Sequence, residues 1–427
     1  MKTLIKNGHL VDSKNKIDEV MDLLIENDHV KKVAKKIAEK ADREIDAKGK
    51  IVAPGLIDIH VHLRQPGYEY KETIETGLRA ALAGGFTGVC PMANTNPVAD
   101  RRSDMEFAVS EARRLGLANL WPIGAVTLKH EGKELTEFGE LKKGGAVGLS
   151  DDGHPVSDSN ILRRALEYSK KFGLPILVHC QDEGLFGCGC MNEGAVSTRL
   201  GLPGIPPEAE SVEVARDIQL AGLTGGQLHF CHISSRRSLD LIRQAKAQGS
   251  RVTAETCPHY FHLTDEAVFN YNTKAKMNPP LRTKEDVEAV KKALKDGTLD
   301  AIATDHAPHT EGEKDVEFDK APFGIIGLET SLALSLKLVE EKVLTMTELI
   351  RKMSQNPAGI IQVDRGHLSE GAAADVTVFD PDLEWTVEKE KLESKSKNSP
   401  FLGWKMKGRA TDVLVGGKHV LQDGKIA

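Results

Sequence analysis

The stretch "DIHVHLRQPG", residues 58–67, places His60 and His62 at the end of an apolar run that is typical of a buried strand. Residues i and i+2 of a strand point to the same side, so the two imidazoles project together. Two converging imidazoles suit a metal ion such as Zn²⁺. The alternative for this motif alone is a pair of hydrogen-bonded histidines.

More polar residues follow other apolar runs of the chain. His179 lies near the end of "LPILVHC", His232 near the end of "QLHFCHI" and Asp305 at the end of "LDAIATD", and "LSDDG" holds Asp151 and Asp152. Buried histidines and aspartates are costly unless they are paired or bind a metal. Taken together with the first motif, these residues predict one metal site.

The elements that position these residues form a regular pattern. Eight apolar, β-rich runs recur at residues 55–63, 86–92, 120–126, 145–150, 174–180, 227–233, 251–256 and 299–305. Most are separated by segments of helical periodicity with capping residues and terminal glycines. Strands alternating with helices indicate an α/β protein, and eight units over about 300 residues predict a (β/α)₈ TIM-like barrel. His229 is out of phase with His232 in the same run, and we expect it to face the helices.

An open doubly wound sheet is the alternative architecture. It usually carries a Gly-rich phosphate loop after its first strand, where this chain has histidines. In a barrel, by contrast, side chains at the C-terminal ends of the strands meet at one active-site mouth.

The two ends of the chain differ from the middle. Residues 1–54 and 356–427 hold short β-type runs with turn signals such as Asn-Gly. We expect them to pair into one small β-sandwich built from both termini, next to a barrel formed by residues 55–355.

The overall composition of the chain limits the classes of binding partner that we expect. The 427 residues carry a net charge of −6, are 40% hydrophobic and 28% charged, and include six cysteines. The charge gives no reason to expect nucleic acid. No apolar run approaches the roughly 20 residues that span a bilayer, so no membrane partner is expected. The scattered cysteines are typical of a reducing, cytoplasmic setting.

Several motifs together resemble a known family. "DIHVHLRQPG", "GGFTGVCPMANTNP", "ETCPHYF", "KMNPPLR" and "TDHAPH" are similar to the amidohydrolase superfamily and, within it, to the bacterial class I dihydroorotases. The similarity runs from "VAPGLID" to "GWKMKGRATDVLVGGK", nearly the whole chain. It implies hydrolysis of a cyclic amide at a binuclear metal centre.

The resemblance implies the ligands. It assigns His60, His62 and Asp305 to one metal, and His179 and His232 to the second. Many relatives bridge the metals with a carboxylated lysine, but "GLSDDG" offers none, and we assign Asp152 as the bridge with Asp151 as the alternative. Two Zn²⁺ per subunit are expected, with the occupancy of the second site open. Mn²⁺ and Co²⁺ accept the same donors.

The resemblance also implies the reaction. It is the reversible cyclisation of N-carbamoyl-L-aspartate to (S)-dihydroorotate in pyrimidine biosynthesis, through metal-activated hydroxide with Asp305 as general acid and base. The expected substrate contacts are His62, Arg64, Asn94, Asn278, His309, Phe323 and Gly324. Arg64, Asn94 and His309 would hold the substrate carboxylate, and Asn278 with the backbone around Phe323 and Gly324 the pyrimidine edge. Segment 309–324 is expected to be either a lid or a static connection.

Two other functions compete with this one. A hydantoinase or allantoinase acts on an uncharged ring and does not require the set of Arg64, Asn94 and His309. A non-enzymatic partner of aspartate transcarbamoylase would have lost ligands, whereas every expected ligand is present here. The resemblance implies a homodimer and leaves association with aspartate transcarbamoylase open.

Overall fold

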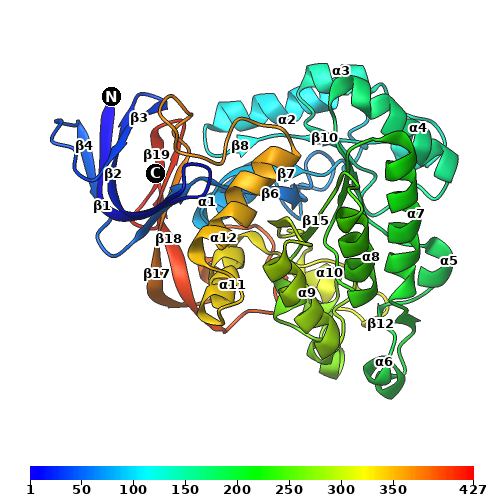
Figure 1. Ribbon diagram of the computed structural model, residues 1–427. Helices are drawn as coiled ribbons and strands as arrows, with labels where there is room; N and C mark the ends of the chain where they lie inside the picture. The colour runs from blue at the N-terminus through cyan, green and yellow to red at the C-terminus, as the bar shows by residue number, and fades with distance from the viewer.

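The computed structural model describes all residues from 1 to 427 and contains two kinds of sheet (Figure 1). Strands from both ends of the chain form one sheet at one end of the molecule, and parallel strands with helices form the rest. None of the helices has the length and apolar character that crossing a bilayer requires.

A strand lies in each of the eight predicted runs, and the third run holds two short strands because Trp121 and Pro122 interrupt it. The strands are β6 (Leu56–Val61), β7 (Phe86–Pro91), β8 (Asn119–Leu120), β9 (Ile123–Gly124), β10 (Gly148–Leu149), β11 (Ile176–Val178), β14 (Leu228–Phe230), β15 (Val252–Thr256) and β16 (Ala301–Ile302). They form two parallel sheets in the orders β6-β7-β8 and β9-β10-β11-β14-β15-β16. The sheets meet after β16, where the His62 N–H donates to the His306 carbonyl at 2.8 Å.

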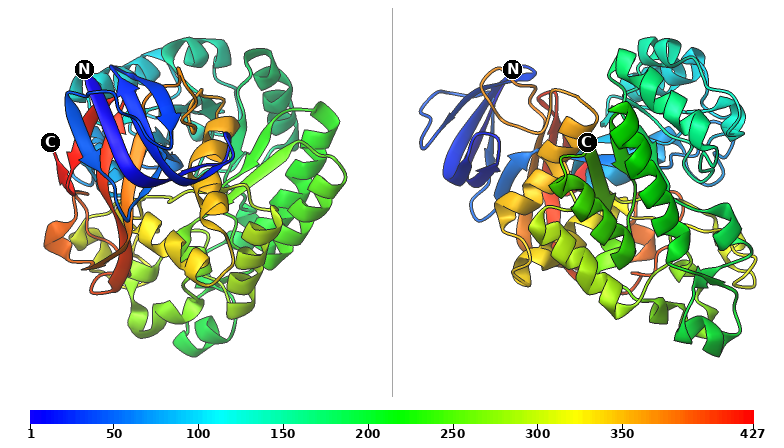
Figure 2. Two further views of the ribbon diagram at one scale, coloured as in Figure 1. Left: turned by 60° about the vertical axis from the view of Figure 1, so that its left-hand side comes forward. Right: turned by 45° about the vertical axis from the view of Figure 1, so that its right-hand side comes forward.

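Helices follow most of these strands in the chain (Figures 1 and 2). The longer ones are α1 (Ile74–Ala83), α2 (Arg102–Leu115), α3 (Phe138–Gly144), α4 (Ser159–Ser169), α7 (Glu208–Thr224), α8 (Arg236–Ala247), α9 (Lys284–Asp296) and α11 (Leu328–Glu340). Local chemistry sets their ends: the Asp158 carboxylate accepts the N–H groups of Asn160 and Ile161 at the start of α4. After the turn that follows α4, Gly173 adopts a φ of 62°, which suits a residue without Cβ.

Short helices and strands lie in the loops between the longer elements. They are α5 (Glu183–Phe186), β12 (Met191–Asn192), α6 (Ala195–Leu200), β13 (Gly204–Ile205), α10 (Glu311–Lys314), α12 (Met346–Ile350) and α13 (Asn356–Ile360). Short 3₁₀ segments span Leu128–His130, Lys170–Phe172, Pro258–Phe261, Asp265–Tyr271, Thr273–Ala275 and Lys389–Lys391, and a π-helical turn spans Arg351–Gln355. Non-helical residues interrupt two of them, Lys129 in the first and Phe269 with Asn270 in the fourth.

The terminal sheet joins the two ends of the chain (Figure 2). Its strands are β1 (Lys2–Asp12), β2 (Ile17–Glu26), β3 (His29–Ala34), β4 (Arg43–Asp46), β5 (Ile51–Pro54), β17 (Val376–Thr386), β18 (Lys405–Val415), β19 (Lys418–Gln422) and β20 (Lys425–Ile426). β5 connects the halves because it pairs with β1 in parallel and with β17 in antiparallel fashion. A cluster of 13 buried apolar residues from both halves forms a separate core here.

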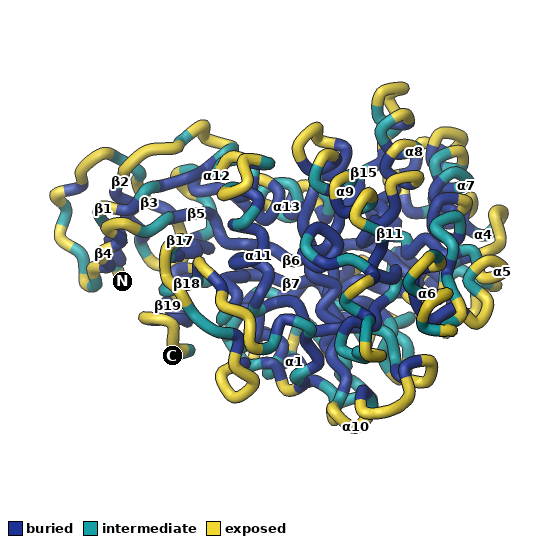
Figure 3. Tube along the Cα trace, turned by 90° about the horizontal axis from the view of Figure 1, so that it is seen from below, coloured by how far each residue is buried: buried dark blue, intermediate teal, exposed yellow.

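Alternation along the middle strands sorts side chains between the helices and the interior. On β11, Ile176 packs in the large core cluster that also contains helix residues, whereas Leu177 belongs to a separate small cluster. At the end of β14 the same alternation separates Phe230 from Cys231, the next residue. The middle strands and the helix faces against them are buried, and the exposed residues lie in loops, on outer helix turns and along strands of the terminal sheet such as β2 and β3 (Figure 3).

Truncating a core side chain of the terminal sheet tests whether both ends share one core. Leu414 on β18 is fully buried in that core, opposite Val376 on β17. We expect Leu414→Ala to lower the free energy of unfolding by about 2–5 kcal/mol, because it leaves a cavity. Urea unfolding followed by circular dichroism measures this. Leu383→Ala, at a side chain that is 40% exposed, is the control, and an equal loss there would contradict the assignment.

Candidate metal centre

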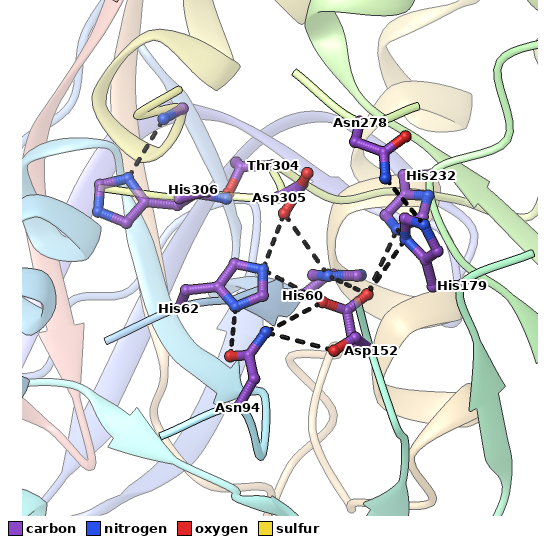
Figure 4. A network of polar contacts seen from close by, with 12 residues as sticks. His60, His62, Asn94, Asp152, His179, His232, Asn278, Thr304, Asp305 and His306 are labelled. Atoms are coloured by element: carbon purple, nitrogen blue, oxygen red, sulfur yellow. Dashed lines mark hydrogen bonds and ion pairs between the residues drawn. The ribbon is translucent and has the colours of Figure 1, made fainter. Parts of the chain in front are cut away.

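Asp152 is the centre of a buried cluster of imidazoles and carboxylates (Figure 4). Its Oδ1 lies 3.4 Å from His60 Nε2, 3.4 Å from His232 Nε2 and 3.6 Å from His179 Nδ1. Its Oδ2 lies 3.5 Å from His62 Nε2. Four histidines from three separate strand ends thus face one carboxylate.

Asp305 completes the cluster from the opposite side. Its Oδ1 lies 2.9 Å from His62 Nε2 and 3.6 Å from His60 Nε2. No other side chain contacts Oδ2 of Asp305, and this residue lines a cavity above the cluster. One carboxylate oxygen therefore faces the histidines while the other is available to a bound molecule.

Hydrogen bonds on the far side of three rings leave their second nitrogens facing the cluster as acceptors. His60 Nδ1 lies 3.2 Å from Glu255, and His62 Nδ1 lies 2.9 Å from the Asn94 carbonyl oxygen. The Gln181 carbonyl oxygen lies 3.3 Å from His179 Nε2. A neutral imidazole has one N–H, and donation outwards leaves the inward nitrogen with its lone pair. Such second partners are typical of metal-binding histidines.

The donor set fits a divalent cation. His60 Nε2 and His232 Nδ1 are buried without a hydrogen-bond partner, and inward-facing His179 Nδ1 and His232 Nε2 are only 3.0 Å apart. Buried lone pairs held this close are unfavourable unless a proton or a cation lies between them. Two sets of three donors have atoms close enough to share one ion: His60 with His62 and Asp305, and His60 with Asp152 and His232.

The electrostatics agree with this arrangement. Burial alone would raise the pKa of Asp152, but the imidazoles of His60 and His232 hold it well below its ordinary value. Burial likewise opposes ionisation of Asp305, yet His62 and His60 lower its pKa to about 2. Burial and the neighbouring His232 lower the pKa of His179 to about 4. The carboxylates are thus charged and His179 is neutral, which are the forms that bind metals.

Unusual backbone angles aim several of these side chains. His232 has a φ of 36° and Asp305 a φ of 47°, in the left-handed region that non-glycine residues seldom adopt. The angle at His232 interrupts the alternation of β14, so that its ring reaches the cluster although Cys231 points to the interior. Asp58 ties two of the strand ends together, because its Oδ1 accepts the N–H groups of His60 and Thr304.

The expectation that His229 faces the helices is wrong. Its Nε2 lies 3.2 Å from Glu255 and its Nδ1 lies 2.8 Å from the Thr253 hydroxyl. Glu255 also contacts His60, so His229 points to the interior and belongs to the layer beneath the cluster. Burial opposes the ionisation of Glu255, but these two imidazoles lower its pKa to about 2.

Asp151 points away from the cluster. Its carboxylate accepts the N–H groups of Val126 and Thr127 and contacts the Thr127 hydroxyl. Burial raises the pKa of Asp151 to about 6, although these donors oppose the shift. The geometry therefore favours Asp152 over Asp151 as the shared ligand.

A cavity of about 250 Å³ opens above the cluster. Apart from His60, which lies beneath it, all the expected site residues line it: His62, Arg64, Asn94, Asp152, His179, His232, Asn278, Asp305, His309, Phe323 and Gly324. Arg64 and His309 lie together, with 3.4 Å between Arg64 Nη2 and His309 Nε2. Asn94 lies on the same side as His62, and its Nδ2 reaches towards the Asp152 carboxylate at 3.4 Å.

The other wall of the cavity consists of Asn278 and the segment around Phe323. Asn278 Nδ2 donates to the Gln181 carbonyl oxygen at 2.6 Å and lies 3.3 Å from His179 Nε2. Gly324 has a φ of 125°, and a Cβ there would lie 2.6 Å from the Ala307 Cβ, so only glycine fits without displacement.

Two buried lysines form hydrogen bonds that hold segment 309–324: Lys276 lies outside the segment and Lys314 lies within it. Lys276 donates to the carbonyls of Phe318 and Asp319, and Lys314 donates to those of Thr273, Lys276 and Pro322. These hydrogen bonds tie the segment to residues 273–276.

Sequence patterns missed three residues that support the site. Glu255 and Gln181 orient ligand histidines, and Asn398 accepts the His309 N–H and donates to the carbonyls of Ala307 and Gly324. The sequence did contain a signal for Glu255, because an acidic residue in an otherwise apolar strand needs a hydrogen-bonding or charged partner. Nothing in the sequence links Asn398 to a segment about ninety residues earlier.

Removing each of the adjacent aspartates separates their roles. We expect Asp152→Ala to lose most of its bound metal, because Asp152 faces four imidazoles. Asp151→Ala should keep its metal but unfold at a lower temperature, since each lost hydrogen bond contributes about 1 kcal/mol. Elemental analysis after gel filtration, with thermal unfolding on the same samples, measures both. Loss of metal from Asp151→Ala alone would reverse the assignment.

Glu255 is expected to raise metal affinity through His60. Glu255→Gln keeps the shape of the side chain but removes the charge that strengthens the His60 N–H bond. We expect metal affinity to fall about 10- to 100-fold. Competition with a chromogenic chelator measures it, and Glu106→Gln, at an exposed carboxylate on α2, is the control. Equal affinities in the two variants would contradict the role.

The chain is similar to known proteins over nearly its whole length. A family model described as dihydro-orotase-like matches residues 49–238. Proteins named dihydroorotase from Geobacter metallireducens and Geobacter sulfurreducens are 56% and 57% identical to it, covering 98% and 99% of this chain and 99% and 100% of theirs. A dihydroorotase from Syntrophus aciditrophicus is 51% identical over 99% of this chain and 100% of its own.

Solved structures with a similar fold are more distant in sequence. An L-hydantoinase (dihydropyrimidinase) from Arthrobacter aurescens superposes with a TM-score of 0.87 at 24% identity, covering 100% of this chain and 97% of its own. A dihydropyrimidinase from Brevibacillus agri gives a TM-score of 0.85 at 24% identity, covering 100% and 96%. These structures share the fold. The full-length identity to the first group, together with the His/Asp cluster, shows that the chain belongs to the dihydroorotase family.

Proposed function

We propose that the protein is a dihydroorotase, which reversibly cyclises N-carbamoyl-L-aspartate to (S)-dihydroorotate and water in pyrimidine biosynthesis. The observation that carries the proposal is the position of Arg64 and His309 beside the His/Asp cluster, within one cavity. Both molecules in the reaction carry a carboxylate that does not react, and a cation beside the cluster suits it. The dihydroorotases that are 51–57% identical to the chain support the same reaction.

The proposed metal ligands are those of the cluster. His60, His62 and Asp305 hold one ion, His179 and His232 a second, and Asp152 is shared. We propose Zn²⁺ for both positions, because imidazole and carboxylate donors suit it. A divalent metal held there would lower the pKa of water and polarise the ring carbonyl that the water attacks.

The protein's own groups handle the proton. In the hydrolytic direction, Asp305 Oδ2 accepts a proton from the attacking water and returns it to the ring nitrogen as the C–N bond breaks. In the biosynthetic direction, Asp305 takes the proton from the ureido nitrogen as that nitrogen bonds to the side-chain carboxyl carbon. Asp305 then returns the proton to the departing carboxyl oxygen, which leaves as water after gaining a second proton from solvent. The contact of Asp305 Oδ1 with His62 fixes the orientation that both directions need.

Substrate orientation comes from the walls of the cavity. Arg64 and His309 bind the carboxylate, with Asn94 as a further donor. Asn278 and the backbone at Phe323 and Gly324 hold the pyrimidine edge. A hydantoinase or allantoinase activity is the competing function, supported by the folds of the structural neighbours. Their uncharged substrates leave the Arg64 guanidinium without an anionic partner, which favours the dihydroorotase.

The architecture and cellular setting belong to the same proposal. The two parallel sheets close into a (β/α)₈ barrel over residues 55–355, and residues 1–54 and 356–427 form a β-sandwich. Support comes from the backbone bridge between Val61 and His306 on one side and the sequence adjacency of β8 and β9 on the other. The family resemblance supports a homodimer and leaves room for association with aspartate transcarbamoylase. Six free thiols fit a cytoplasmic protein.

Ring opening of three substrates tests the function. We expect the zinc-loaded protein to hydrolyse L-dihydroorotate and to leave hydantoin and allantoin nearly untouched, because only the first carries a carboxylate for Arg64. Ultraviolet absorbance of the ring follows each reaction. Removal of metal with a chelator should abolish turnover and added Zn²⁺ should restore it.

Arg64→Met is the matched variant for this assay. It should raise KM for dihydroorotate at least about tenfold, since a charge-assisted hydrogen bond is lost, with metal content unchanged. Preference of the unaltered protein for hydantoin or allantoin would replace the proposed function by the competing one.

A further inference from the structure

Lys71 is a partly buried cation next to the carboxylate pocket, and the proposed reaction assigns it no role. It lies in the loop between β6 and α1, within "GYEYKE". Its side chain is 13% exposed, and its Nζ pairs with Glu313 at 2.8 Å. The rings of Tyr68 and Tyr70 lie 5.4 and 5.5 Å from the same Nζ. Two aromatic rings and one carboxylate thus hold the ammonium in place.

The ammonium contacts His309. Lys71 Nζ lies 3.3 Å from His309 Nδ1, and Arg64 Nη2 lies 3.4 Å from His309 Nε2. Lysine and arginine only donate hydrogen bonds, whereas a neutral imidazole offers one donor and one acceptor. His309 therefore accepts from one of these cations and presents an N–H to the other, which cannot accept it.

Distances and charge decide which nitrogen carries the proton. Burial and the charges of Arg64 and Lys71 lower the pKa of His309 far below its ordinary value, so the ring is neutral. The Lys71 ammonium can turn one of its three N–H groups to Nδ1, which makes Nδ1 the acceptor. Glu313 Oε2 would accept from Nδ1, but at 3.8 Å it is too far for a hydrogen bond. The proton then lies on Nε2.

This tautomer makes a two-pronged donor for an anion. Arg64 and His309 both line the cavity, and Arg64 Nη2–H and His309 Nε2–H, as two donors, cannot satisfy one another. A carboxylate bound between them accepts from both. The other tautomer would place a lone pair on Nε2 towards the anion and repel it.

We infer that Lys71 is a specificity-determining positioning residue, which fixes His309 as the Nε2–H tautomer and so selects a substrate that carries a carboxylate. The inference rests on the proposed function for the identity of that carboxylate. The tautomer itself is independent of the reaction. The backbone of His309 is already fixed, because its N–H donates to Asn398 at 3.1 Å, so the remaining freedom lies in the ring's proton.

The variant Lys71→Met tests the inference on the zinc-loaded full-length protein. It removes the donor while keeping a long side chain, and it leaves Glu313 as the polar group nearest Nδ1. We expect the proton of His309 to move to Nδ1. Nitrogen-15 chemical shifts of histidine-labelled protein report the tautomer, and the His309→Gln spectrum assigns the signal.

Binding of two ring compounds supplies the functional readout. Orotate carries the carboxylate and dihydrouracil lacks it. We expect Lys71→Met to weaken orotate binding at least about tenfold, the loss of roughly one charge-assisted hydrogen bond, and to leave dihydrouracil binding and metal content unchanged. KM for dihydroorotate should rise more than kcat falls. Lys71→Arg keeps a donor and should restore most of the orotate affinity.

Lys395→Met is the matched control. Its Nζ donates to the Glu69 carbonyl on the same rim and has no contact with His309. An Nε2–H tautomer and unaltered orotate affinity in Lys71→Met would overturn the inference. Equal weakening of orotate and dihydrouracil would also overturn it, because that pattern means a general structural role. If the unaltered protein neither binds orotate nor opens dihydroorotate, the proposed function fails, while the nitrogen-15 spectra still decide whether Lys71 sets the tautomer.

Discussion

Four imidazole nitrogens facing one buried carboxylate are the constraint on which this structure depends. Asp152 is nearly inaccessible to solvent, and each of the four rings presents a nitrogen to it at 3.4–3.6 Å. Buried lone pairs and negative charges at this spacing are unfavourable without a cation. The arrangement of the four rings therefore suits metal binding. The elements around the cluster hold the rings in place although they repel one another.

A second layer of hydrogen bonds does that holding. Glu255, beneath the cluster, contacts both His60 and His229, and Gln181 contacts His179 from the side. Glu255 lies on β15, far from His60 in the sequence, whereas Gln181 lies two residues after His179. The result is that ring orientation and tautomer are set before a metal binds, which lowers the cost of binding.

On the side of the cavity that holds Arg64 and His309, neighbouring charged side chains fix the ring of His309, as Glu255 fixes the ring of His60. Arg64 and Lys71 are cations on either side of the neutral His309, and Glu313 balances one of them. The pocket thus has a positively charged edge next to the neutral His309 ring, and the neighbouring cations decide which ring nitrogen carries the proton. In the proposed function, this edge favours a ring that carries a carboxylate over an uncharged ring.

The sequence by itself determined the eight β-type runs, the alternation with helices and the ligand types at the strand ends, because periodicity and the cost of burying His or Asp are local properties. It also identified the cavity residues, from Arg64 to Gly324, through motifs that resemble a family. Residue patterns alone could not choose between Asp151 and Asp152, since adjacent residues share every local signal, and the assignment of Asp152 came from the resemblance. Only the fold shows that Asp151 is used by the N–H groups of Val126 and Thr127, which leaves Asp152 to face the rings. Tertiary structure alone also decided the direction of His229 and the role of Lys71. A left-handed φ at His232 breaks the strand alternation, and Lys71 meets His309 only because loops far apart in the chain close over one cavity.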